Sequence, residues 1–534
     1  MTVSTSATVS NSASLLNLGL SARPGDKNYW GELQAAGRAL AIAEAAQQFD
    51  GLSVLVTETA REASAQSRAL AFFSAQQQLP ILNFPDWETL PYDIFSPHQD
   101  IVSARLQTLS NLPNAQHALL IVPLPTLMHR LAPTDFIASR TFAYRVGELL
   151  DRDQLQQQLS RAGYNRVDTV YEHGEYAFRG SLIDIYPMGA KRPFRIDLLD
   201  DEIESLRLFD SESQRTSENV SQIELLPARE FPLDKPACNQ FLNNWHTHFD
   251  QDPSKCPVYR DIKDGIAPQG IEYYLSLFFD QTASLFDYLP EKVQLFSHVG
   301  IEDAALAFWQ DTNARYAEYG VDPTRPILPP KELFLGVEEV FHQIKQLPRT
   351  EIDRQPSKAG AGSVNFNLRA VPDVAVNSKL SNPLSKLQEF LDGFSGRVLF
   401  CAESAGRREV LAGLLKKINV IATEVDNWQA FIDSSERFSV TTYPIDQGVY
   451  CPDQHICLIT EGELFGQQVM QRRRRSKASE SPDHIFKSLA ELQHGAPVVH
   501  MDHGVGRFQG LVTLEVDKSV QEFLMLVYAN DAKL

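Results

Sequence analysis

The sequence lacks the features that mark secreted proteins, membrane proteins and proteins that coat nucleic acid. Its 534 residues include only 5 cysteines, which form no CxxC pair, so neither a disulfide framework nor a zinc site is indicated. The longest apolar stretch, residues 119–131, is interrupted by two prolines and is too short to span a bilayer. The net charge of −19 argues against a surface that covers a phosphate backbone. We therefore expect a cytoplasmic protein with buried, reduced thiols that docks other proteins.

The sequence also lacks a phosphate-binding loop. No Gly-Lys dipeptide occurs, and the first strand-to-helix junction reads VTETAR over residues 56–61. A carboxylate at Glu58 in this junction would repel phosphate. The acidic run 201–204 has the pattern of a solvated strand end, and His500 and His503 have no third metal ligand nearby in sequence. The residues therefore predict no catalytic group, cofactor or metal in this chain.

Apolar periodicity divides the chain into several domains. Buried strands followed by helical stretches, within residues 52–63, 79–93 and 117–131, predict an open and mostly parallel sheet. Residues 140–210 change to a helix followed by long alternating runs, typical of a small antiparallel sheet with one helix. We interpret this part as a domain inserted between the two halves of the first.

The second half of the chain contains two polar segments. Residues 349–382 are polar and rich in glycine, which indicates a linker. A compact α/β unit follows, in which Ser404 is positioned to cap a helix. Arg472 to Arg475 indicate a solvated basic linker, with contact to DNA or to a protein partner as the alternative. The last 50 or so residues are β-rich and contain glycines that permit the bends of a small barrel.

Several motifs together resemble the transcription-repair coupling factor family. The run YEHGEYAFRGSLIDIYPMG, continued by RPFRIDLLDDEIESLRLFD, is similar to the domain that this family shares with the excision-repair protein UvrB. FPDWETLPYDIFSPHQDIVSARL, ITEGELFG and PVVHMDHGVGRFQG are similar to further segments of the coupling factor. The resemblance covers nearly the whole chain and ends within the RNA-polymerase-interacting domain.

The resemblance implies a fold class and a domain order. We expect an α/β multidomain chain with a degenerate helicase-like parallel sheet, an inserted α+β domain, a second small α/β domain and a partial C-terminal SH3/Tudor-like β-barrel. The expected boundaries are a disordered tail 1–15, domain 1a 16–135, an inserted UvrA-binding domain 2 136–212, domain 1b 213–348, a linker 349–382, domain 3 383–470, a basic linker 471–483 and a truncated CarD-like polymerase-interacting domain 484–534.

The resemblance also implies two protein partners. The excision-repair protein UvrA, which scans DNA for damage, is expected on the inserted domain, through the exposed arginines Arg166, Arg179 and Arg195, with Gly180 as a bulge that turns Arg179 outward. The RNA polymerase β subunit is expected on the final β-rich segment, through Met501 and Arg507 at an open strand edge.

Two further interpretations concern DNA. The full-length family member would be a translocase that uses ATP and Mg²⁺ and contacts DNA mainly through motor lobes that follow this part of the sequence. The alternative is a damaged-DNA-binding protein like UvrB. Residues 84–106 leave no room for the tyrosine-rich hairpin with which UvrB grips DNA, which disfavours that alternative.

Overall fold

The computed structural model contains two compact units, residues 1–468 and 469–534. The residues that it describes are 15–18, 23–75, 79–377, 382–466, 497–500, 504–516 and 519–527. The predictions for the N-terminal tail as far as residue 14, for Arg472 to Arg475 and for Met501 lie outside these residues.

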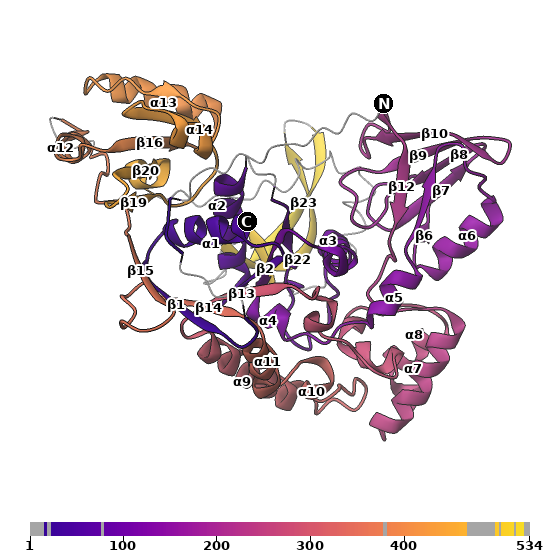
Figure 1. The fold of residues 1–534 in the computed structure, drawn as a ribbon. Coiled ribbons are helices and arrows are strands. Elements are labelled where there is room, and N and C mark those ends of the chain that lie inside the picture. The colour runs from indigo at the N-terminus through magenta and orange to yellow at the C-terminus, as the bar shows by residue number, and fades with distance from the viewer. Residues whose placement is uncertain are drawn as a thin grey trace, which may run out of the picture. The chain divides into compact units, whose positions relative to one another are not determined.

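A seven-stranded sheet forms the centre of the first unit, and all its strand pairs are parallel (Figure 1). The strands β2 and β4 are buried at every position, because helices cover both faces of the sheet and these strands are almost entirely apolar. This confirms the predicted parallel sheet. Its strands, in spatial order, are β15 (Ser363–Leu368), β1 (Lys27–Leu33), β14 (Arg349–Ile352), β13 (Val293–His298), β2 (Leu52–Thr57), β4 (Ala118–Pro123) and β3 (Ile81–Asn83).

Separate hydrophobic cores lie on the two faces of this sheet. Leu55 and Ile121 contribute to one core, whereas Val54 and Leu120 contribute to the other, as strand alternation requires. The first core contains the helices α1 (Gly37–Gln48) and α2 (Ala60–Ser74). The second contains α3 (Gln99–Asn111), α4 (Leu124–Leu127), α5 (Thr134–Ser139), α9 (Ile301–Tyr319) and α11 (Val337–Gln346).

The segment 349–382, interpreted above as a linker, contains two strands of the central sheet. β14 lies between β1 and β13, and β15 pairs with the other edge of β1. Polar and apolar residues alternate in β15, so that only Phe366 and Leu368 are buried. The linker assignment is therefore wrong for these residues. The glycine-rich turn before β15 and the asparagines within β15 make the sequence of this half-buried edge strand look like that of a linker.

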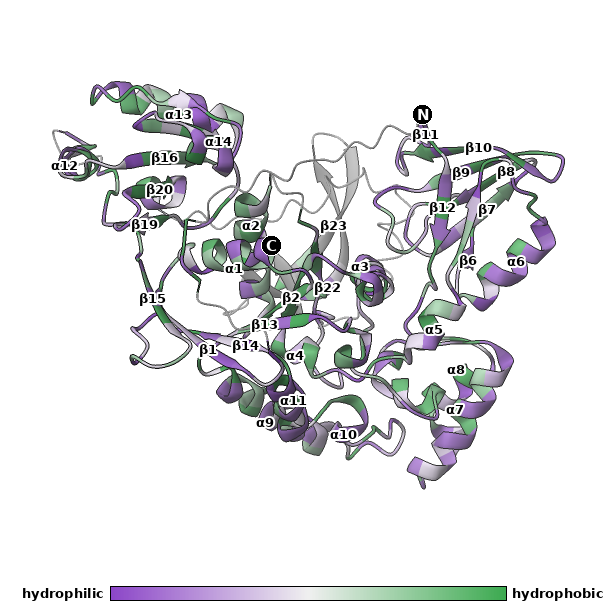
Figure 2. Ribbon diagram, viewed as in Figure 1, coloured by the Kyte–Doolittle hydropathy of each residue, from purple (hydrophilic) through white to green (hydrophobic). Residues whose placement is uncertain are grey.

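The inserted domain is a six-stranded sheet with one covering helix, α6 (Arg152–Arg161). Figure 2 shows how hydrophilic this helix is compared with the strands. The sheet, in spatial order, consists of β11 (Thr216–Val220), β10 (Glu202–Phe209), β9 (Phe194–Leu199), β8 (Leu182–Ile185), β7 (Glu175–Arg179) and β6 (Asn165–Arg166). A separate antiparallel pair joins β5 (Phe142–Arg145) to β12 (Gln222–Leu225). The domain therefore extends beyond the expected boundary at residue 212, because β11 is an exposed polar edge strand without an apolar pattern.

Aromatic residues build a helical region between β12 and β13. Trp245, Tyr274 and Phe241 are fully buried within it. Of the segment 213–348, which the sequence assigned to completing the first sheet, only β13 joins that sheet. The helices of this region are α7 (Lys235–His248), α8 (Pro257–Lys263) and the 3₁₀ helices η2 (Pro253–Lys255), η3 (Ile271–Phe278) and η4 (Leu285–Tyr288). The helix α10 (Pro330–Leu333), which follows β13 in the chain, contributes Leu333 to the same aromatic core.

The small α/β domain has five strands, parallel except for β19. Ser404 accepts a hydrogen bond from the backbone of Arg407 and so caps α13, as predicted. Trp428 packs against Phe72 and Phe73 of α2 and joins this domain to the central sheet. Its elements are α12 (Ser385–Gly393), β16 (Arg397–Ala402), α13 (Ala405–Lys416), β17 (Thr423–Glu424), α14 (Trp428–Asp433), β18 (Phe438–Thr442), β19 (Val449–Cys451), β20 (Ile456–Thr460) and α15 (Glu461–Phe465).

The second unit contains an antiparallel sheet of β21 (Pro497–His500), β22 (Gly504–Val516) and β23 (Ser519–Val527). Gly510 adopts a φ of 116° where the register between β22 and β23 shifts. The described strands form an open sheet, and no closed barrel is found among them. The expected SH3/Tudor-like barrel is therefore not confirmed.

All five cysteines are buried and unpaired, as expected. Within the described ranges, no helix is long and apolar enough to cross a membrane. The same residues contain no cluster of three acidic, histidine or cysteine side chains arranged to hold a metal ion.

Candidate protein-interaction site on the inserted domain

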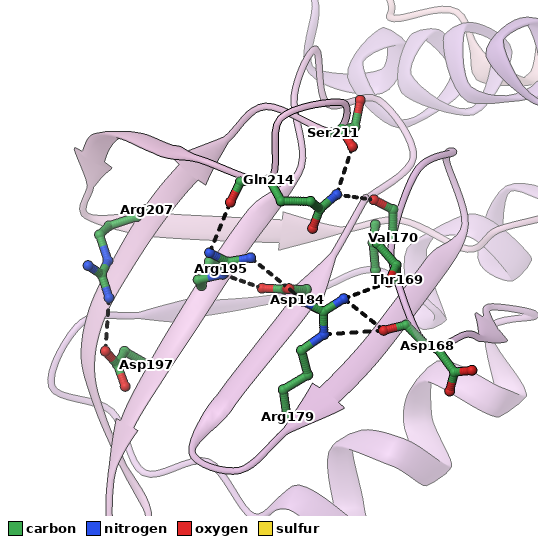
Figure 3. Close-up of polar contacts among 10 residues, drawn as sticks. All are labelled: Asp168, Thr169, Val170, Arg179, Asp184, Arg195, Asp197, Arg207, Ser211 and Gln214. Carbon is green, nitrogen blue, oxygen red and sulfur yellow. Dashed lines mark hydrogen bonds and ion pairs between the residues drawn. The ribbon is translucent and has the colours of Figure 1, made fainter. Parts of the chain in front are cut away.

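A buried carboxylate, that of Asp184, organises one face of the sheet in the inserted domain, which we call the outer face. Asp184 lies in the middle of β8 with only 1% of its side chain exposed. In register, Asp184 pairs with Ala177 of β7 and Arg195 of β9, so these residues share one face of the sheet. Figure 3 shows Arg179 and Arg195 approaching this carboxylate from the two neighbouring strands. A single acid within the apolar run LIDI carries no sequence signal of this role.

Arg195 is held rigidly by this carboxylate. Its Nε and Nη2 donate to the two Asp184 oxygens at 2.6 and 2.9 Å, and Nη1 donates to the carbonyl of Gln214 at 3.3 Å. Its guanidinium also lies 4.8 Å from the centroid of the Phe209 ring. The hydrogen bonds to Asp184 raise the pKa of Arg195 despite its partial burial. Only 14% of the Arg195 side chain is exposed, so the expected exposed position is wrong for this residue.

Arg179 is more accessible than Arg195, and its guanidinium is also held in position by several contacts. Its Nε and Nη2 donate to the carbonyl of Asp168, and Nη2 also donates to Thr169 Oγ1 at 2.8 Å. Nη1 lies 3.8 Å from Asp184 Oδ2, and 39% of the side chain is exposed. Gly180 is not a bulge: it has a φ of 62° in the two-residue turn between Arg179 and Leu182, which pair directly.

Arg166 lies on the other face of the sheet. It pairs in register with Tyr176, which is buried in the core. The Arg166 guanidinium lies 5.7 Å from the Phe178 ring centroid, and that of Arg152 from α6 lies 5.3 Å from the same ring. The three predicted arginines therefore do not share one face: Arg179 and Arg195 lie together, whereas Arg166 is exposed at the edge strand β6.

Chemically, the outer face offers oriented guanidinium donors. A second pair, Arg207 and Asp197 at 2.8 Å, extends the row of charges onto β10 and β9 (Figure 3). Because Asp184 and the Asp168 carbonyl fix Arg179, little side-chain entropy is lost when an acidic group binds it. The arrangement suits recognition of a carboxylate-bearing protein surface.

The degenerate junction after β2 differs from its expected form in one respect. Glu58 is exposed, and Thr59 caps α2 by accepting a hydrogen bond from the Glu62 amide at 3.2 Å. The carboxylate at the centre of the junction is that of Glu62, which lies 2.9 Å from Arg38 and 3.0 Å from His298. No sequence pattern indicates this cluster, because its members come from distant parts of the chain.

In the second unit, β21 pairs with β22, and its other edge has no partner among the described strands. Arg507 lies on β22, opposite Pro497 and Val527, and is exposed. The run around Phe523 pairs with β22, for example Phe523 with Val512.

Three family models match parts of the chain. They are the UvrB interaction domain at residues 142–231, the MFD D3 domain at 390–464 and the CarD-like/TRCF RID domain at 492–534. The first match begins at β5 and ends just after β12, the two strands that pair at the base of the inserted domain.

Curated relatives match along almost the entire chain. The transcription-repair-coupling factor of Escherichia coli K12 is 42% identical over 516 residues, which are 96% of this chain and 44% of the relative. The protein of the same name from Haemophilus influenzae Rd is 40% identical with the same coverage, and that from Bacillus subtilis 168 is 24% identical over 85% of this chain and 39% of its own. The chain thus spans less than half the length of these relatives.

The fold and these matches define a multidomain α/β protein in which a UvrB-type interaction domain is inserted into a parallel sheet. The chain belongs to the transcription-repair-coupling factor family, and it corresponds to the N-terminal half of the family's members, ending in the RID domain.

Proposed function

We propose that this chain is the recruitment part of a transcription-repair coupling factor. The inserted domain binds the excision-repair protein UvrA, and the final β-rich unit binds the β subunit of RNA polymerase stalled at a DNA lesion. The segment that matches a UvrB-type interaction domain carries oriented arginines on its sheet, and this combination supports the proposal. ATP-driven translocation with Mg²⁺, and most contact with DNA, belong in this proposal to the full-length protein.

Within the inserted domain, the arginines take different roles. Arg179 contacts UvrA directly, because it is half-exposed and already oriented. Arg166 adds a second contact at the edge strand. Arg195 supports binding chiefly by holding Asp184, which in turn fixes Arg179, since its own guanidinium is largely covered.

Charge reversal tests the first contact. The variant Arg166→Glu/Arg179→Glu is expected to bind immobilised UvrA at least about tenfold more weakly, the loss typical of interface arginines. The matched control is Arg192→Glu, because Arg192 is 37% exposed and hydrogen-bonds Ser217 on the opposite edge strand β11. Unchanged affinity of the double variant, with an intact circular dichroism spectrum, would show that UvrA binds elsewhere.

The polymerase contact is proposed at the edge of β21 that has no partner among the described strands. An unpaired strand edge can add a partner strand through main-chain hydrogen bonds. Met501→Arg is expected to abolish capture of core RNA polymerase without unfolding the first unit, and Arg507→Ala to weaken it. Full binding by a folded Met501→Arg variant would place the contact on another surface.

A further inference from the structure

The carboxylate of Glu62 lies at the junction between β2 and α2, where it contacts an arginine, a histidine and a backbone N–H. Its Oε1 accepts from Arg38 Nη1 at 2.9 Å and lies 3.0 Å from His298 Nε2. Its Oε2 accepts from the backbone N–H of Glu58 at 3.3 Å. Burial alone would raise the pKa of Glu62, but the hydrogen bond and charge of His298 and the charge of Arg38 lower it to about 2. The carboxylate is therefore held as an anion.

The groups around this carboxylate come from three elements of the central sheet and its helices. Arg38 lies in the first turn of α1, Glu62 lies in the first turn of α2, and His298 is the last residue of β13. Arg38 is nine-tenths buried, and its Nε makes no hydrogen bond within the described part of the molecule. A helix cap alone requires neither a buried arginine nor a histidine from a distant strand.

The donors around Glu62 are a guanidinium, an imidazole and one backbone N–H just before the N-cap of α2, and groups of this kind bind tetrahedral oxyanions. Backbone N–H groups at a helix start, a guanidinium and an imidazole are recurrent ligands of phosphate in α/β proteins. The carboxyl ends of the strands of such sheets are also where ligands bind. We propose that this junction is a latent phosphate site that the chain occupies with its own carboxylate, Glu62, so that no external phosphate can enter.

The self-occupied site has two consequences. Glu62 excludes phosphate by charge and by volume, whereas Glu58 is exposed and only adds repulsion. The carboxylate also links α1, α2 and β13 as a bound anion would. Removing it should leave two cationic or polar side chains and a free N–H facing a small vacated space.

The test compares the whole chain with Glu62→Ala and with Glu62→Gln, whose amide keeps the space filled. Thermal unfolding is followed in sodium phosphate and in sodium chloride at equal ionic strength. Phosphate stabilises most proteins because it is excluded from their surface. The measured quantity is therefore the rise in melting temperature that phosphate causes in the variant, minus the rise that it causes in the parent. Glu62→Ala is expected to gain about 2 °C or more beyond the parent and beyond Glu62→Gln. Adding Arg38→Met should remove this gain.

Calorimetric titration with inorganic phosphate should show one site in Glu62→Ala and none in the parent. A folded Glu62→Ala variant that gains no more from phosphate than the parent would refute the proposal and leave Glu62 as a helix cap only. If Glu62→Ala does not fold in chloride, rescue by phosphate but not by chloride supports the proposal, and failure of both salts overturns it.

Discussion

The pair of Arg105 and Glu230 offers a direct measure of what a buried ion pair contributes here. Arg105 Nε lies 2.5 Å from Glu230 Oε1, Nη2 lies 3.1 Å from Oε2, and Nη1 donates to the Pro85 carbonyl at 2.9 Å. The guanidinium carbon lies 4.3 Å from the Phe84 ring centroid and 5.1 Å from that of Trp87. Neither side chain is more than 4% exposed. Arg105 thus fixes the start of the loop 84–98 against the segment that leaves the inserted domain.

Replacing Arg105 by methionine keeps much of its volume but leaves Glu230 buried. Among the described residues, its remaining hydrogen-bond donor is then the Trp87 indole N–H at 3.4 Å. Breaking a buried pair from one side costs about 3–5 kcal/mol. The double variant Arg105→Met/Glu230→Leu removes both charges, and should recover a large part of that loss.

Urea unfolding of the parent, the single variant and the double variant, followed by circular dichroism, measures these differences. A loss of less than about 1 kcal/mol in Arg105→Met, or a double variant no more stable than the single one, would contradict this expectation.

Three further perturbations have defined outcomes. Folding lowers the pKa of Glu62 from 4.5 to about 2, so the contribution of this carboxylate to the free energy of unfolding is present above pH 4.5 and lost as the pH falls towards 2. We therefore expect Glu62→Gln to cost about 2–3 kcal/mol at pH 7, allowing for solvent screening, and much less at pH 3. Urea unfolding at both pH values measures this difference. Asp184→Asn should lower stability by about 2 kcal/mol, because it weakens the charge-assisted bonds to the partly buried Arg195, and a calorimetric unfolding scan would detect this. Gly448→Ala would place a Cβ 2.0 Å from the Leu458 carbonyl oxygen, and should cost about 1–3 kcal/mol in the same scan.

The sequence predicts the buried parts of this fold better than its edges. Strands such as β2 and β4 are apolar at nearly every position, so their pattern alone locates them. The edge strands β11 and β15 are polar on their exposed sides, and they become strands only through pairing with neighbours already in place. Local propensity therefore could not distinguish them from linker.

The residues of the candidate sites are likewise only partly predictable from the sequence. Arg179 could be proposed from its motif, but the face on which each arginine lies depends on strand register. That register separates Arg166 from Arg179 and buries much of Arg195 against Asp184. The cluster at Glu62 could not be predicted, because His298 and Arg38 are 260 residues apart in the chain.

The order of strands in the central sheet also affects how the chain is synthesised. β1 is the first strand of this sheet to leave the ribosome, yet both of its neighbours, β14 and β15, are translated more than 300 residues later: Tyr29 pairs with Glu351 and with Ser363. Until then, both hydrogen-bonding edges of β1 lack their native partners, and exposed edges of this kind promote aggregation. The inserted domain, whose six-stranded sheet lies within residues 165–220, can pair its strands long before the sheet that carries it is complete.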